Sequence, residues 1–206
     1  KTARNRKSTP TKFASIGEMV KGRLGPRRHV IWGLSKDFGA AGWRAGVLWT
    51  QNQGLLNTFA RNMAKFASLS APVQCVVEEV LNDRDFVASY LEETRKRLES
   101  SCDIAMLALQ AMELPYLEPD AGIFIWCDCR SLLPKDVDTD PQASKEAEAS
   151  LCKTLREEAG ILMTPGMALH QQEPGWFRLC YASVTHVELE RGMQRFKDWV
   201  CSRKGA

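Results

Sequence analysis

An amine and a guanidinium lie near each other in the first quarter of the sequence, at a spacing that could serve one small ligand. Lys36 stands in the run SKDFG, and Arg44 follows it by eight residues in the run GWRAG. A lysine amine reacts with an aldehyde when it is unprotonated, which burial and nearby positive charge favour by lowering its pKa. A guanidinium offers phosphate oxygens a planar fork of donors. The pair therefore predicts a site for a ligand that carries both an aldehyde and a phosphate.

Segments far apart in the sequence resemble one enzyme family. The run HVIWGLSKDFG from His29 to Gly39 is similar to the lysine segment of pyridoxal-phosphate (PLP) enzymes of the aspartate aminotransferase fold. More narrowly, it resembles the 1-aminocyclopropane-1-carboxylate (ACC) synthase branch and its animal and microbial relatives. The runs AGIFIWCD, from residue 121, and PGWFRLCY, from residue 174, resemble small-domain segments of the same family. The resemblance extends from about residue 27 to about residue 200.

The resemblance implies roles for four side chains. Lys36 would hold PLP as a Schiff base and, once a substrate has displaced it, would act as general base on the substrate Cα hydrogen. Arg44 would bind the cofactor phosphate, with the hydroxyl of Ser35 nearby, and Arg178 would grip the substrate α-carboxylate. Gly33 stands where many family members carry another phosphate-binding hydroxyl. One phosphate contact of the family is therefore unmatched.

Other parts of the family's cofactor site also find no match in this sequence. These are the aromatic residue that stacks on the ring, the aspartate that pairs with the pyridine nitrogen, and the asparagine and tyrosine that contact the ring hydroxyl. The sequence begins at Lys1, and its 206 residues are about half of a complete family member. We therefore expect a C-terminal portion of such an enzyme, with the unmatched residues upstream.

Several alternatives remain open at this point. A chain that lacks half of a cofactor site could be a non-catalytic remnant that acts at most as a binding or dimerisation module. Taken singly, Lys36 could be an ordinary exposed lysine, Arg44 a surface arginine, and Arg178 an arginine at a strand edge in a salt bridge. Residues 1–28 hold nine Lys and Arg against Glu18 alone, which suggests a nucleic-acid contact. Because residues 1–10 lack interleaved aromatics, a solvated, mobile segment is favoured instead.

The composition limits which binding partners and which cellular compartment are expected for the chain. Seven cysteines, an odd number without repeated spacing, do not indicate a disulfide framework, and no run of about 18 apolar residues could span a membrane. Cys127 and Cys129 have no partner pair at metal-ligand spacing, so packing is favoured over a metal site. We expect amino-acid substrates, a cytoplasmic location, no nucleic-acid or membrane partner and, as the family implies, a homodimer of the complete protein.

Hydrophobic periodicity predicts helices and strands in alternation, which places the chain in the α/β class. A glycine-rich loop is expected around Lys36, with Gly39 and Gly42 letting the backbone turn closely around a ligand. A loop is also expected at 132–142. The predicted strands are 29–34, 45–50, 123–126, 161–164 and 176–182, and the predicted helices are 52–68, 71–81, about 83–112, 143–159 and 187–200.

The long predicted helix suggests a connection between two domains. Residues 1–85 would be the remainder of the PLP-binding large domain, with a basic and mobile segment at 1–26. Residues 86–206 would be the small C-terminal domain, entered through the long helix. The expected fold is thus the C-terminal part of the PLP-dependent transferase (aspartate aminotransferase) fold, the end of the large domain plus an α/β small domain.

Overall fold

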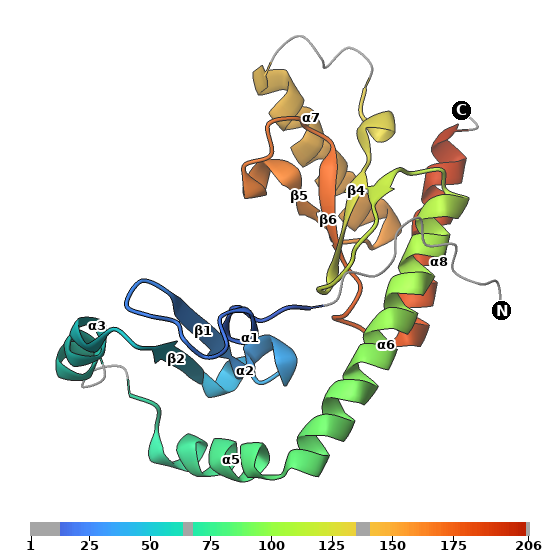
Figure 1. The fold of residues 1–206 in the computed structure, drawn as a ribbon. Helices are drawn as coiled ribbons and strands as arrows, with labels where there is room; N and C mark the ends of the chain where they lie inside the picture. Colours follow the sequence, from blue (N-terminus) through green and yellow to red (C-terminus); the bar gives the residue numbers. More distant parts are fainter. Residues whose placement is uncertain (1–12, 64–67, 135–140, 205–206) are drawn as a thin grey trace. The chain divides into compact units, whose positions relative to one another are not determined.

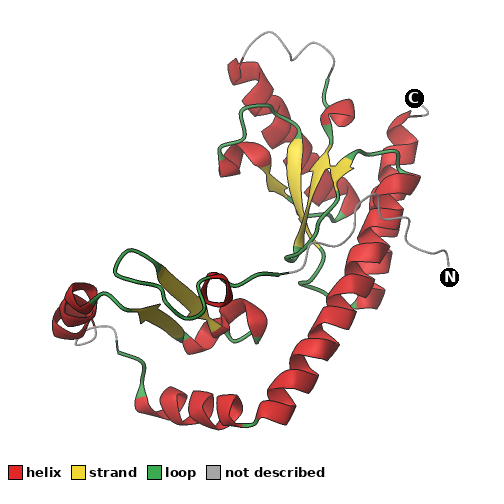
Figure 2. Cartoon of the chain, in the orientation of Figure 1, coloured by secondary structure: helices red, strands yellow, loops and turns green. Residues whose placement is uncertain are grey.

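The computed structural model describes residues 13–63, 68–134 and 141–204 (Figure 1). Helices and strands alternate along these residues (Figure 2), so the predicted α/β class is confirmed. The first twelve residues of the basic segment lie outside the described residues.

The chain divides into two compact units inside its longest helix. The N-terminal unit spans Pro10–Thr94, and the C-terminal unit contains Arg95–Ala206. The domain boundary predicted from the sequence lies at 85/86, at the start of that helix. The assignment of these two units to the large and small domains of the expected fold stays a prediction.

An antiparallel hairpin forms the centre of the N-terminal unit. Strand β1 (His29–Gly33) pairs with β2 (Gly46–Thr50), from His29 opposite Thr50 to Gly33 opposite Gly46. The other elements of this unit are α1 (Ile16–Met19), α2 (Leu34–Asp37), η1 (Ala41–Trp43), α3 (Gln53–Thr58), the π-helical turn η2 (Phe59–Met63), α5 (Ala71–Asn82) and the start of α6 (Arg84–Ala111).

The helix predicted at 52–68 begins at Gln53, because the side chain of Asn52 caps it by accepting a hydrogen bond from the Leu55 amide at 2.9 Å. Residues 64–67 of that prediction lie outside the described residues.

Apolar side chains of the hairpin remain exposed. Ile31 is 84% exposed, Val47 49% and Trp49 42%. The hydrophobic residues that are buried in the described part of this unit are Leu24, Leu34 and Ala45. The N-terminal unit therefore has only a small core of its own.

The C-terminal unit contains a four-stranded antiparallel sheet. Its strands, in spatial order, are β3 (Tyr116–Leu117), β4 (Phe124–Asp128), β6 (Trp176–Cys180) and β5 (Thr164–Pro165). Strands β4 and β6 pair over their full lengths, from Phe124 opposite Cys180 to Asp128 opposite Trp176. The helices of this unit are the rest of α6, η3 (Arg130–Leu132), α7 (Pro141–Thr154), the π-helical turn η5 (Leu155–Ala159), η6 (Gly166–Leu169) and α8 (His186–Lys204).

Helices cover one face of this sheet. Side chains alternate between the two faces of a strand, and Ile125, Cys127, Phe177 and Leu179 form one core with buried residues of α6, α7 and α8 (Figure 1). The opposite face carries partly exposed side chains from the same two strands, Phe124, Trp126, Trp176 and Arg178. The inner face thus holds the domain together, while the outer face presents aromatic and cationic groups.

One predicted strand is largely absent. The strand expected at 161–164 begins only at Thr164, because the amide of Ile161 is used to close the preceding helical turn on the Leu155 carbonyl at 3.0 Å. Gly160, with φ +64°, provides the left-handed residue that ends that turn.

The predicted loop at 132–142 also differs from the structure. The short helix η3 ends at Leu132, residues 135–140 lie outside the described residues, and α7 already begins at Pro141.

Candidate functional site

Lys36 lies in α2, a single helical turn where the sequence predicted a loop. The turn is closed by the Phe38 amide, which donates to the Leu34 carbonyl at 3.1 Å, and extended Gly33 precedes it. The side chain of Lys36 is exposed. The burial that sequence analysis expected for this amine is therefore not found.

Aromatic contacts hold α2 in place. The indole Nε1 of Trp32 donates to the Asp37 carboxylate at 2.6 Å. The ring of Phe38 meets Trp32 edge-on, with centroids 6.3 Å apart, and stacks on Tyr90 of α6 at 5.4 Å. Leu34, at the start of the turn, is buried. The turn that carries Lys36 is thus held by aromatic contacts and by a buried residue.

Arg44 follows directly after η1 in a strained conformation. Its φ is +53°, a left-handed value that non-glycine residues seldom adopt. Its Nη1 donates to the Ala41 carbonyl at 3.3 Å, and the side chain is exposed. Gly39 has a left-handed backbone, with φ +62°, whereas Gly42 lies inside η1 without a positive φ. The close approach of the backbone to a ligand at Gly39 and Gly42 stays a prediction.

Arg178 occupies an inner strand, because β6 lies between β4 and β5. Its guanidinium carbon lies 4.3 Å from the centroid of the Phe124 ring, and its Nη2 donates to the Thr164 hydroxyl at 3.3 Å. Its Nε is buried and has no hydrogen-bond partner among the described residues. Arg178 is thus not the strand-edge arginine of the alternative hypothesis, and it keeps one donor unsatisfied.

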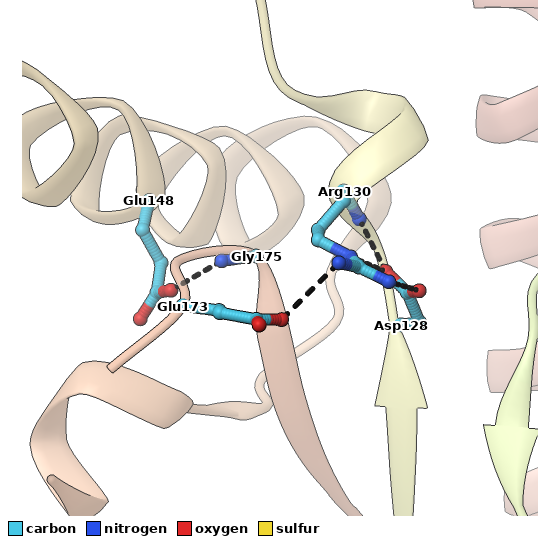
Figure 3. A network of polar contacts seen from close by, with 5 residues as sticks. All are labelled: Asp128, Arg130, Glu148, Glu173 and Gly175. Atoms are coloured by element: carbon cyan, nitrogen blue, oxygen red, sulfur yellow. Dashed lines mark hydrogen bonds and ion pairs between the residues drawn. The ribbon is translucent and has the colours of Figure 1, made fainter. Parts of the chain in front are cut away.

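A polar network lies at the end of β4 and the start of β6 (Figure 3). The guanidinium of Arg130 donates to both carboxylate oxygens of Asp128, at 3.0 and 2.7 Å, and to Glu173 at 3.2 Å. This side-chain hydrogen bonding lowers the pKa of Asp128 against the opposing effect of burial. Arg130 also lies over the ring of Trp176, at 5.4 Å from its centroid.

Glu148 of α7 contributes the other half of the network. Its side chain is 1% exposed and accepts hydrogen bonds from the backbone amides of Met167 and Gly175. Sequence reasoning missed this residue, because an Ala-Glu-Ala run on a charged helix gives no sign that the carboxylate turns inward. It also missed the pairing of Asp128 with Arg130, although an acid and a base two residues apart at a strand end were visible.

The structure distributes the predicted site residues between its two units. Lys36, half-buried Ser35 and Arg44 share one segment of the N-terminal unit, and Arg178 belongs to the C-terminal unit. Cys127 and Cys129 lie in the core, where their mutual hydrogen bond and then burial raise the pKa of the Cys129 thiol. Within the described residues, no cluster of three or more side chains could hold a metal ion.

Comparison with known proteins identifies the family. The model of the family described as aminotransferase class I and II matches residues 8–196. The chain belongs to this family. It is 34% identical to 1-aminocyclopropane-1-carboxylate synthase 11 of Arabidopsis thaliana over 196 residues, which cover 94% of this chain and 41% of that protein. It is 33% identical to 1-aminocyclopropane-1-carboxylate synthase 1 of Oryza sativa subsp. indica, over 95% of this chain and 40% of that protein.

Solved structures show the same fold. The aromatic aminotransferase of Pyrococcus horikoshii superposes with a TM-score of 0.77 at 21% identity, over 96% of this chain and 48% of that one. Aspartate aminotransferase of Thermus thermophilus with maleate gives a TM-score of 0.70 at 21% identity, over 86% of this chain and 42% of that one. The predicted fold is confirmed, and the chain spans about 40% of the length of the curated relatives it matches.

The donor set of the N-terminal unit suits the reactive ends of PLP. The amine of Lys36 suits the aldehyde, and the hydroxyl of Ser35 and the guanidinium of Arg44 suit the phosphate. In the part of the chain that the structure describes, the guanidinium of Arg44 makes one hydrogen bond, to the Ala41 carbonyl of its own turn, and the side chain is exposed. Among the described residues, no helix has the length and apolar character needed to cross a membrane.

Proposed function

We propose that this chain provides the lysine and the two arginines of a PLP-dependent enzyme that acts on α-amino acids. The observation that carries the proposal is the state of Arg178, which lies on an inner strand with a buried Nε that has no partner among the described residues. A buried polar donor without a partner costs free energy. An incoming carboxylate would satisfy it, which is the role that the family resemblance gives to this arginine.

In this proposal each group has one task. Lys36 holds the cofactor and moves the proton at the substrate α-carbon. Arg44 and Ser35 bind the cofactor phosphate, and the strained backbone of Arg44 supports a functional placement. Arg178 binds the substrate α-carboxylate. When bound, PLP supplies a ring that accepts electrons and so stabilises negative charge at that carbon.

Two reactions fit this set of residues. One is transamination of an amino acid to a 2-oxo acid, and the other is the formation of ACC from S-adenosylmethionine with loss of methylthioadenosine. The 34% identity to an ACC synthase of Arabidopsis thaliana favours the ACC synthase-like group. We further propose a homodimer of the complete protein in the cytoplasm.

A second candidate function is a non-catalytic remnant that acts as a binding or dimerisation module. One observation that favours it is the side chain of Lys36, which is exposed rather than buried. The small core of the N-terminal unit points in the same direction, because apolar side chains of the hairpin remain partly exposed, most of all Ile31.

An absorbance scan of the purified chain with PLP separates the two candidates. We expect a borohydride-reducible band, and peptide mapping should place the label on Lys36. Lys36→Ala should lose the label, whereas Lys153→Ala, at an exposed position of α7, should retain it. No reducible band, or a label spread over many lysines, would overturn the enzymatic proposal for this chain and leave the binding module.

A further inference from the structure

We propose that Glu148 is a positioning residue for Arg178 and that it acts by fixing the first residues of β6. The proposal rests on the proposed role of Arg178 as the ligand of the substrate carboxylate. Among the described residues, the Glu148 carboxylate accepts hydrogen bonds from the backbone amides of Met167 and Gly175 and not from Arg178, so it acts on Arg178 through the backbone of these two loops.

Glu148 connects three elements with one carboxylate. Oε2 accepts a hydrogen bond from the amide of Gly175, just before β6, at 2.5 Å (Figure 3). Oε1 accepts one from the amide of Met167 in η6 at 2.9 Å. Burial of a carboxylate is costly unless hydrogen bonds replace its water. With 1% of its side chain exposed, Glu148 depends on these two amides, and the two loops are held at fixed positions against α7.

Gly175 leaves the backbone little freedom at this point. Its φ is +89°, a value that favours glycine, and an added Cβ would lie 2.8 Å from Cγ of Arg130 and 2.9 Å from Cδ1 of Leu133. Its carbonyl accepts the Cys129 amide at 2.8 Å, while its own amide binds Glu148. Both polar backbone groups of Gly175 are therefore occupied immediately before β6 begins.

The two anchored loops lead to the two strands that hold the Arg178 side chain. Gly175 lies three residues before Arg178 on β6, and Met167 lies three residues after Thr164 on β5. The hydroxyl of Thr164 accepts from Arg178. A shift of β6 by one residue would turn Arg178 toward the core face. Glu148 thus fixes both β6, which carries Arg178, and β5, which carries Thr164.

The Nε–H signal of Arg178 in a ¹H–¹⁵N spectrum of the full chain reports the position of this side chain. It is buried, and it lies beside the Phe124 ring, whose ring current makes its shift sensitive to small movements. Loss of the signal in Arg178→Lys would assign it. Thr164→Val removes the hydroxyl that accepts from Arg178 and should move the signal without changing the exchange of the Gly175 amide.

Glu148→Gln is the decisive variant, because it keeps the shape and replaces one acceptor oxygen with a donor NH₂ that must face a backbone amide. We expect the Arg178 signal to shift or broaden and the Gly175 amide to exchange about tenfold faster or more. The matched control is Glu146→Gln on the exposed side of α7, which should leave both unchanged. A folded Glu148→Gln with fast Gly175 exchange and a wild-type Arg178 signal would show that Glu148 is merely structural.

If Glu148→Gln does not fold, the proposal is tested with Glu148→Asp and with the wild-type chain. Glu148→Asp keeps both acceptors but shortens their reach, and it should shift the Arg178 signal. In the wild type, the Gly175 amide should exchange far more slowly than that of exposed Gly122. Equal exchange would overturn the proposal.

A titration with sodium pyruvate keeps this proposal separate from the proposed function. A change of the Arg178 signal with pyruvate supports carboxylate binding, and an unchanged signal counts against that role. The comparison of Glu148→Gln with Glu146→Gln tests the positioning of Arg178 in either case.

Discussion

The guanidinium of Arg178 lies over the ring of Phe124, at 4.3 Å from the ring centroid. The contact joins diagonal neighbours on β4 and β6, because Arg178 is opposite Trp126 in the register and Phe124 is two residues away on the same face. A cation over an aromatic ring is attracted by the negative face of the ring. Phe124 therefore contacts the guanidinium of Arg178 through its ring face. The N–H donors, which lie in the guanidinium plane, can still bind another partner.

A double-mutant cycle with Phe124→Leu and Arg178→Met should give a coupling free energy of about 1 kcal/mol, because the cation–ring contact is partly desolvated. Urea unfolding of the four proteins measures it. As a control, Phe124→Leu is combined with Arg156→Met, an exposed arginine that pairs with Glu157. That second cycle should give no coupling, and a zero value for the first cycle would remove Phe124 as a support.

Asp128→Asn should lower the free energy of unfolding at neutral pH by about 1–2 kcal/mol, because Arg130 loses the carboxylate that accepts two of its hydrogen bonds. The folded pKa of Asp128 is lowered below its ordinary 3.8. The stabilisation is therefore fully present above pH 3.8 and is lost as the pH falls through the folded pKa.

Urea unfolding of the wild type and of Asp128→Asn at pH 7, and again at steps below pH 4, measures this dependence. The difference between the two proteins should shrink at the acid end. Glu118→Gln, at an exposed position, serves as the control and should differ little from wild type at either pH. A difference for Asp128→Asn that persists unchanged to low pH would contradict the electrostatic explanation.

Phe177→Ala should destabilise the C-terminal unit by about 3–5 kcal/mol, because the ring is completely buried in the core and its loss leaves a cavity. Leu162→Ala removes a side chain that is 76% exposed and should cost less than about 0.5 kcal/mol. Chemical denaturation followed by circular dichroism compares them. Similar midpoints for the two variants would show that the inner face of the sheet is not the core.

Two glycine substitutions should change stability in opposite directions. Gly160→Ala places a side chain at φ +64° and should cost about 1 kcal/mol. Gly192→Ala lies inside α8, where a Cβ would meet no atom closer than 3.9 Å, and should gain up to about 1 kcal/mol. Thermal unfolding of both variants measures the signs. A gain for Gly160→Ala would mean that the turn after η5 has another conformation in solution.

Local patterns predicted much of the fold. The three- and four-residue spacing of apolar side chains along residues 83–112 indicated one long helix, and α6 runs from Arg84 to Ala111 as a single helix. The strand predicted at 176–182 is found at Trp176–Cys180. Both features depend on the spacing of apolar residues within one continuous segment, which can be read directly from the sequence.

Features that depend on distant partners were not predictable in the same way. The strand expected at 161–164 needed a neighbour, and β6 pairs on that side only with Thr164 and Pro165. Glu148 appeared as one more charge on an amphipathic helix, because its amide partners are 19 and 27 residues away. The one-turn helix around Lys36 likewise depends on the stacking of Phe38 against Tyr90. The roles of Lys36, Ser35, Arg44 and Arg178 stay predictions that the labelling and titration experiments test.

The exposed hairpin of the N-terminal unit affects how readily the chain aggregates in solution. In the part of the chain that the structure describes, β1 and β2 pair only with each other, so each strand keeps one edge of open N–H and C=O groups. Open edges beside exposed Ile31 and Trp49 act as templates for strand addition by a second molecule. Aggregation should therefore begin at this hairpin and rise steeply with concentration, so dilute samples and charged substitutions at Ile31 are the way to keep the chain monodisperse.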